Sequence, residues 1–229
     1  METDESAGRA DRDRATAFSE RLSALKERGS MLLVVGPATH DAVRAACHRL
    51  LGDPTETRRR LFVRTAQRSA ADSMVLPLDG AGDRLRTITF QTPTRSAAAS
   101  TADDSPIPTT PVDGDLGDLL AEIGAATTAL APEGDALEPA ALRICIDSAD
   151  ALVDTHDERD VFQFLHGVAG LVRSTRAMCH VHLPAPLSAT AVQTVAPLFD
   201  AVVEVRDEGG VKQRWHLPDD DLTTDWLLL

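Results

Sequence analysis

Five apolar residues in a row, Met31 to Val35, stand between a Gly-Ser pair and Gly36-Pro37. The run is too short for a helix. Its continuous apolar character is typical of a strand that is buried on both faces, as strands in parallel sheets are. Amphipathic sequence follows from Thr39 onward and predicts a helix. A buried strand, a glycine turn and a helix together restrict the chain to folds in which helices cover a parallel sheet.

The same alternation of strand and helix continues along the chain. Strands are expected at 61–63, 85–90, 142–146, 178–183, 201–205 and 211–217, and helices at 15–28, 39–51, 115–130, 158–172 and 188–196. Such alternation implies right-handed crossovers and parallel pairing. Gly209 and Gly210 separate the last two strands and predict a hairpin. The expected fold class is α/β, a mainly parallel sheet with helices on both faces that ends in an antiparallel hairpin.

Residues 14–229 are interpreted as a single domain. The segment 1–13 is polar and mixed in charge, so we expect it to be disordered, and it lacks the apolar stretch of a secretory signal. Residues from about 92 to 112 are rich in Ser, Ala, Thr and Pro and predict a mobile loop. No run of about 18 apolar residues occurs, so we expect no membrane association and a cytoplasmic location.

The charge balance indicates the environment of the protein. The formal net charge is −13, lysine occurs only at Lys26 and Lys212, and tyrosine is absent. In molar salt the Debye length falls to about 3 Å, which screens the repulsion between surface carboxylates. The sequence therefore predicts a halophilic archaeal source, with an ordinary acidic protein from a GC-rich genome as the alternative. The same charge argues against a nucleic-acid partner.

The turn after the first strand occupies the place of a phosphate loop, G-x-x-x-x-G-K-[ST]. Counted from Gly36, the second glycine is replaced by Asp41, the lysine by Ala42 and the hydroxyl residue by Val43. These changes remove a cation and a magnesium ligand. A carboxylate near the phosphates would repel them by about 1 kcal/mol in water and by several in a drier site. In the first helical turn, Asp41 instead complements the helix dipole.

A second motif combines the apolar strand 142–146 with Asp147-Ser148. It looks like the strand and aspartate that orient magnesium in phosphate-loop enzymes. Alternatively, Asp147 caps the following turn. The residues after the second strand, from Arg64 to Gln67, contain no carboxylate, so a base that would activate water is not expected.

Together these features resemble the RecA/KaiC-like phosphate-loop NTPases, whose fold is a three-layer sandwich. The segment from Ile144 to Arg206 is similar to an uncharacterised haloarchaeal family of degenerate relatives of these enzymes. The resemblance implies a pseudo-ATPase with no catalytic residues and no cofactor. It also implies a degenerate nucleotide site made of Gly36, Pro37, Asp41, Asp147 and Ser148.

His180 and His182 alternate along an expected strand, so both side chains lie on one face. Two imidazoles could begin a zinc site with a third ligand from His166 or Asp147. We favour a hydrogen-bonded pair and expect no metal. Because ligands bind at the carboxyl ends of strands in open α/β sheets, the two histidines form a possible ligand edge.

Three cysteines, Cys47, Cys145 and Cys179, lie in separate apolar runs without metal-type spacing. We expect them to be reduced and buried. Whether Cys47 and Cys145 approach each other depends on how their elements pack.

The sequence thus favours a non-catalytic domain that acts as a regulatory or protein-interaction module, through self-association or a protein partner. One alternative is a nucleotide or small-ligand sensor that binds without hydrolysis. The other is an ATPase with a non-standard phosphate loop. That loop would need glycines before a lysine and a helix, whereas Lys212 follows two glycines in an expected hairpin.

Overall fold

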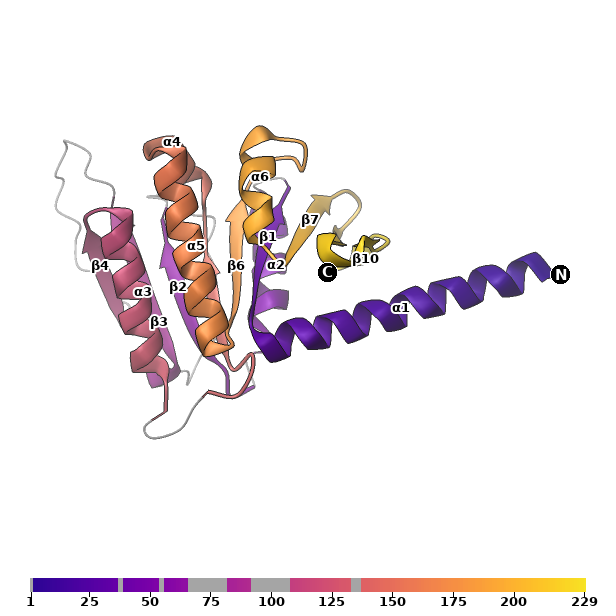
Figure 1. Ribbon diagram of the computed structural model, residues 1–229, viewed down its shortest axis with the longest axis horizontal. Coiled ribbons are helices and arrows are strands. Elements are labelled where there is room, and N and C mark those ends of the chain that lie inside the picture. The colour runs from indigo at the N-terminus through magenta and orange to yellow at the C-terminus, as the bar shows by residue number, and fades with distance from the viewer. Residues whose placement is uncertain (1, 37–38, 54–55, 66–81, 92–107, 133–136) are drawn as a thin grey trace.

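The computed structural model of the chain describes residues 2–36, 39–53, 56–65, 82–91, 108–132 and 137–229. Its strands form one sheet in the order β10-β8-β7-β1-β6-β5-β2-β3-β4, with β9 also paired to β8. Neighbours from β7 to β4 are parallel, whereas β8 is antiparallel to β7, β9 and β10 (Figure 1). The strands are β1 (Ser30–Val35), β2 (Arg59–Arg64), β3 (Leu85–Gln91), β4 (Thr109–Asp113), β5 (Leu142–Ile146), β6 (Met178–Leu183), β7 (Ala201–Asp207), β8 (Val211–Leu217), β9 (Leu222–Thr223) and β10 (Leu227–Leu228).

Helices cover both faces of this sheet, so the expected mainly parallel α/β fold with a terminal antiparallel hairpin is confirmed. On one face, α3, α5 and α6 pack on a core that includes Met31, Leu33 and Val35 of β1. On the other face, Leu32 and Val34 of the same strand pack with α2 and the end of α1. The helices are α1 (Glu2–Arg28), α2 (His40–Leu51), α3 (Leu116–Leu130), α4 (Asp150–Thr155), α5 (Glu158–Thr175) and α6 (Thr190–Val195).

Two segments differ from the sequence expectation. Residues 2–13, within the segment expected to be disordered, belong to α1, which begins at Glu2 and projects from the body of the molecule (Figure 1). No proline interrupts 2–28, and Glu, Ala and Arg favour a helix. The end of the expected mobile loop, 109–112, lies in β4, because this stretch pairs in parallel with β3 at the sheet edge. Residues 92–107 of that loop lie outside the described part.

Across the described ranges, no helix combines the length and apolar character needed to cross a membrane.

Candidate functional site

Gly36 follows β1 and lies against β7. Its φ is +134°, and a Cβ at this position would lie 2.2 Å from the carbonyl oxygen of Val205. Its amide donates a hydrogen bond to the carbonyl oxygen of Ala185 at 3.0 Å. The neighbouring backbone therefore requires glycine here, independently of any nucleotide. Pro37, the next residue of the expected site, lies outside the described residues.

The start of α2 uses its own residues to satisfy its backbone. The hydroxyl of Thr39 accepts a hydrogen bond from the amide of Ala42 at 3.4 Å. Ala42, at the lysine position of the phosphate-loop pattern, is 1% exposed and belongs to the core beneath α2. Asp41 is exposed, and its carboxylate lies 3.4 Å from the guanidinium of Arg44. The helix start thus offers a buried methyl group and an exposed carboxylate where the phosphate-loop pattern has a cation and a glycine.

Asp147 and Ser148 lie where β5 ends, beside the end of β2. Asp147 is 7% exposed, and its Oδ1 accepts a hydrogen bond from the Thr65 amide at 2.9 Å and lies 3.0 Å from the Thr65 hydroxyl. The Ser148 hydroxyl contacts the carboxylate of Asp150. The contacts between Asp147 and Thr65 join the ends of two neighbouring strands. Asp147 therefore has a structural role in the sheet, different from the turn cap that its sequence position suggested.

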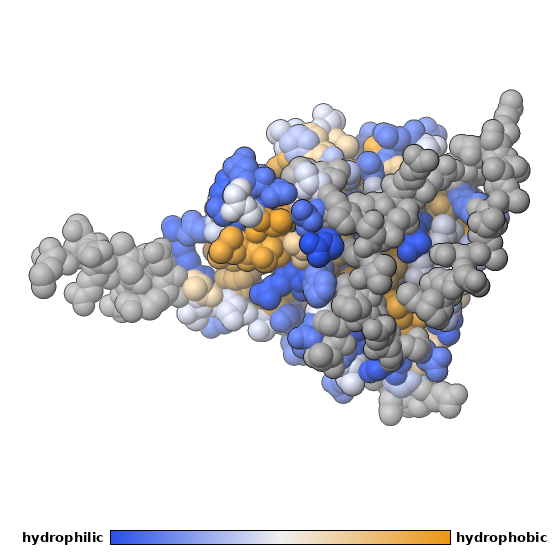
Figure 2. Space-filling model, turned by 180° about the vertical axis from the view of Figure 1, so that it is seen from behind, coloured by the Kyte–Doolittle hydropathy of each residue, from blue (hydrophilic) through white to orange (hydrophobic). Residues whose placement is uncertain are grey.

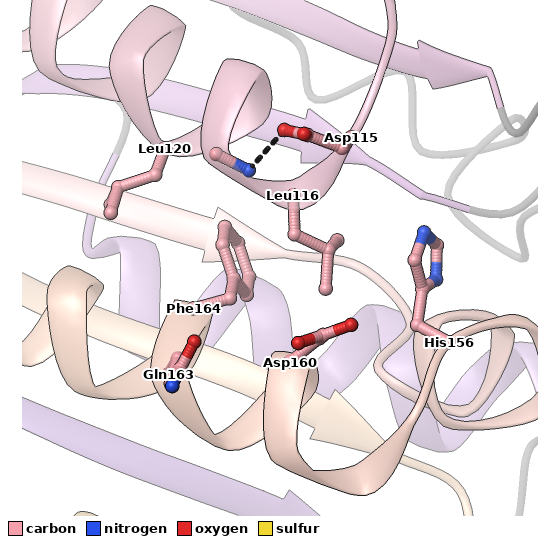
Figure 3. A pocket seen from close by; sticks show the side chains of 8 residues that line it. Asp115, Leu116, Leu120, His156, Asp160, Gln163 and Phe164 are labelled. Carbon is pink, nitrogen blue, oxygen red and sulfur yellow. Dashed lines mark hydrogen bonds between the residues drawn. The ribbon is translucent and has the colours of Figure 1, made fainter.

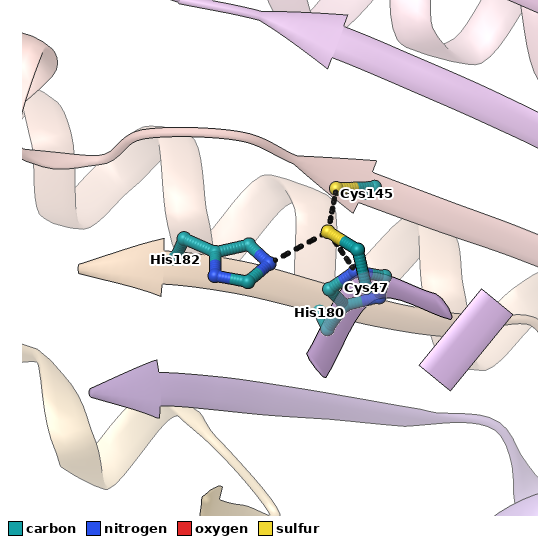
Figure 4. A group of neighbouring side chains, drawn as sticks. All are labelled: Cys47, Cys145, His180 and His182. Atoms are coloured by element: carbon teal, nitrogen blue, oxygen red, sulfur yellow. Dashed lines mark hydrogen bonds between the residues drawn. The ribbon is translucent and has the colours of Figure 1, made fainter. Parts of the chain in front are cut away.

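Among the residues that the structure describes, the densest group of reactive side chains lies deeper, between the sheet and α2. His180 and His182 of β6 meet Cys47 of α2 and Cys145 of β5 (Figure 4). The Cys47 Sγ lies 3.5 Å from the Cys145 Sγ, 3.5 Å from the His180 Nε2 and 3.0 Å from the His182 Nε2. None of the four is more than 4% exposed. The two histidines share one face, as predicted, but they lie under α2 and not at an open ligand edge.

The four side chains perturb one another's ionisation. A hydrogen bond from Cys145, together with the nearby histidines, lowers the pKa of the Cys47 thiol against the opposing effect of burial. Its contact with Cys47 and its burial raise the pKa of Cys145. Burial lowers the pKa of His180. Burial also acts to lower the pKa of His182, but the negative charges of Cys47 and Asp147 outweigh it and raise that pKa. Cys47 is thus the position in the group that best accommodates a thiolate.

The residues that complete this group differ from those considered in the sequence. His166, one suggested third ligand, is exposed on α5, which packs on the opposite face of the sheet. The partners are Cys47 and Cys145, whose approach the sequence left open. The register between β5 and β6 places Cys145 beside His180. Only the period-two spacing of the histidines was visible in the sequence, because the cysteines come from distant positions in the chain.

A pocket of about 400 Å³ lies on the other face of the sheet, between α3 and α5 (Figure 3). The Asp115 carboxylate accepts hydrogen bonds from the amides of Gly117 and Asp118, so it caps α3. The walls of this pocket come from segments on either side of β5 in the chain, so no local sequence pattern predicts it. Its lining consists of Asp115, Leu116, Gly117, Leu120, His156, Asp160, Gln163 and Phe164.

Comparisons with known proteins agree with this architecture. Over 71 residues, the chain is 37% identical to Elongator complex protein 4 of Dictyostelium discoideum, a match that spans 31% of this chain and 16% of that protein. A KaiC-like protein of Pyrococcus horikoshii OT3 has a similar structure, with a TM-score of 0.54 and 12% identity over 88% of this chain and 82% of that one. This likeness supports the expected KaiC-like fold. Residues 29–205 match a family of unknown function, DUF7504, and because they make up most of the chain, the protein belongs to that family.

Proposed function

We propose that this chain is a non-catalytic RecA/KaiC-like module that acts through contacts with other proteins. The observation that carries the proposal is Ala42, a buried core residue at the position where a phosphate loop needs its lysine. The other features agree with it. The Gly36 amide is hydrogen-bonded to Ala185, and the Asp147 carboxylate is hydrogen-bonded to Thr65. A site with this composition lacks the charge that neutralises a triphosphate.

We further propose that the module assembles through the end of its sheet formed by β10. This strand is the last on its side of the described sheet, and an edge strand can pair with another chain. Leu227 and Leu228 of β10 are exposed, the latter to 75%. Figure 2 shows an apolar area on the face seen from behind, close to where α1 leaves the body of the molecule. A second copy of the chain is the first partner to test. The similarity to a protein named for the Elongator complex is consistent with a role in an assembly.

The net charge of −13 and the scarcity of lysine support a cytoplasmic protein of a halophilic archaeon. Experiments on the function therefore belong in molar KCl, where such a surface is screened.

Phosphate release from Mg-ATP by the purified full-length chain tests the non-catalytic claim. We expect a rate equal to that of the variant Asp147→Asn and of buffer alone. Turnover that disappears in Asp147→Asn would contradict the claim and favour the ATPase with a non-standard phosphate loop. A rise in melting temperature with nucleotide but without turnover would favour the sensor.

Sedimentation velocity over a range of protein concentrations tests the assembly claim. We expect a concentration-dependent dimer that Leu228→Asp weakens. The matched control is Phe162→Asp, which changes an exposed apolar residue of α5. A wild-type chain that stays monomeric at every concentration, or equal effects of both variants, would contradict assembly through β10.

A further inference from the structure

We propose that Cys47, Cys145, His180 and His182 form a closed, structural zinc site that fastens α2 to the sheet. The proposal rests on the geometry of these four side chains and is independent of the function proposed above. It differs from the sequence expectation of no metal because the structure brings together four donors where the sequence offered two.

The positions of the donors follow from elements that are fixed relative to one another. β5 and β6 are adjacent parallel strands, and their register pairs Cys145 with His180. His182 lies two residues further along β6 and therefore on the same face. Helix α2 covers this face and brings Cys47 to the other three residues. Two strands and a helix therefore hold the donors from three directions (Figure 4).

The distances from the Cys47 sulfur to the other donors are close to those around a four-coordinate zinc ion. Zinc–sulfur bonds of about 2.3 Å and zinc–nitrogen bonds of about 2.0 Å at tetrahedral angles place two sulfurs about 3.8 Å apart and a sulfur and a nitrogen about 3.5 Å apart. The two sulfurs are 3.5 Å apart here, and the Cys47 Sγ lies 3.5 Å and 3.0 Å from the two Nε2 atoms. All four donor atoms lie within 4.8 Å of one another. Because the ideal pairs around zinc lie about 3.3–3.8 Å apart, the widest pairs here would have to close by at most about 1.5 Å around an ion.

The chemistry of the donor set selects the ion. Two thiolates and two neutral imidazoles are the ligands of many structural zinc sites, whereas magnesium and calcium take oxygen ligands. Two thiolates also neutralise the divalent charge, which matters because every donor is buried. Four protein ligands leave no position for water or substrate. The site is therefore structural, and binding releases the two thiol protons to solvent.

Such a site would anchor α2 to the sheet from the inner face of the helix. The cross-link would join Cys47 of α2 to Cys145 and His180, which lie 98 and 133 positions further along the chain.

The test is the metal content of the full-length protein, purified without chelator in molar KCl and measured by plasma mass spectrometry. We expect one zinc ion per chain in the wild type and its loss in Cys47→Ala and Cys145→Ala. The matched control is Cys179→Ala, because Cys179 is equally buried but packs on the opposite face of the sheet. This control is expected to keep its zinc. Removal of zinc is expected to lower the melting temperature by roughly 10 °C, since ligands that bind only the folded state stabilise it.

Cobalt substitution of the wild type keeps the proposal testable if the cluster variants do not fold. We expect a thiolate-to-cobalt charge-transfer band and intense visible bands of a tetrahedral centre. Substoichiometric zinc together with no such bands would overturn the proposal. Stoichiometric binding of a different metal, or a Cys47–Cys145 disulfide in the freshly purified protein, would also overturn it.

Discussion

Substitution of Gly36 by alanine separates the two reasons for which this glycine could be present. Its backbone has a φ of +134°, which an alanine adopts only with strain of about 1–3 kcal/mol. The added Cβ would also lie 2.2 Å from the carbonyl oxygen of Val205, so the ends of β1 and β7 would have to separate by about 1 Å. Forced separation of packed elements costs a further 1–3 kcal/mol or so.

Together these effects predict that Gly36→Ala lowers the free energy of unfolding by roughly 2–6 kcal/mol. For a chain of this length the melting temperature would fall by roughly 4–24 °C. Chemical and thermal unfolding in molar KCl, monitored by circular dichroism, measures both quantities. No nucleotide is needed for the effect, because the clash is with the protein's own backbone.

The matched control is Gly210→Ala in the hairpin between β7 and β8. Gly210 has a φ of +114°, but nothing lies within 4 Å of a Cβ at its position. This variant therefore carries the backbone strain without the contact, and we expect the smaller loss of stability. Equal losses in the two variants, or an unchanged stability of Gly36→Ala, would refute the packing explanation and return Gly36 to a role in ligand binding.

Two further outcomes follow from the same structure. Asp147→Ala leaves the buried Thr65 amide without its acceptor and is expected to lower the free energy of unfolding by about 1–3 kcal/mol. The control Asp41→Ala, at an exposed carboxylate, should change this free energy by about 0.5 kcal/mol or less. Similar losses in both variants would contradict the strand-joining role of Asp147. The melting temperature of the wild type should rise between low and molar KCl because salt screens a net charge of −13, and a melting temperature indifferent to KCl would contradict the halophilic interpretation.

Much of the fold was readable from the sequence because the central strands are continuous apolar runs between turn residues. The bounds of β5 and β6 coincide with the predicted 142–146 and 178–183. β4 was missed because its residues carry no such signal. It contains Pro111, most of its side chains are exposed, and pairing with β3 makes it a strand. Strands defined by pairing instead of burial are hard to see in a single sequence.

The candidate sites divide in the same way. The replacement of the phosphate-loop glycine and lysine by Asp41 and Ala42 could be seen in the sequence, since a phosphate loop is a local pattern. The contact between Asp147 and Thr65 could not, because it depends on which strands are neighbours. The cluster around Cys47 was even harder to predict from the sequence. Its residues are individually typical of a core, and they acquire a possible chemistry only when α2 crosses β5 and β6.

The two ends of the sheet are unequal as templates for growth. Among the described strands, β4 closes one end, and its Pro111 has no amide hydrogen to donate to an incoming strand. β10 closes the other end with two consecutive leucines and no proline. If copies of the chain pair edge to edge, this difference between the two edge strands favours a dimer joined β10 to β10 over an open-ended filament. In such an assembly, Pro111 of β4 would hinder pairing at the opposite end of the sheet.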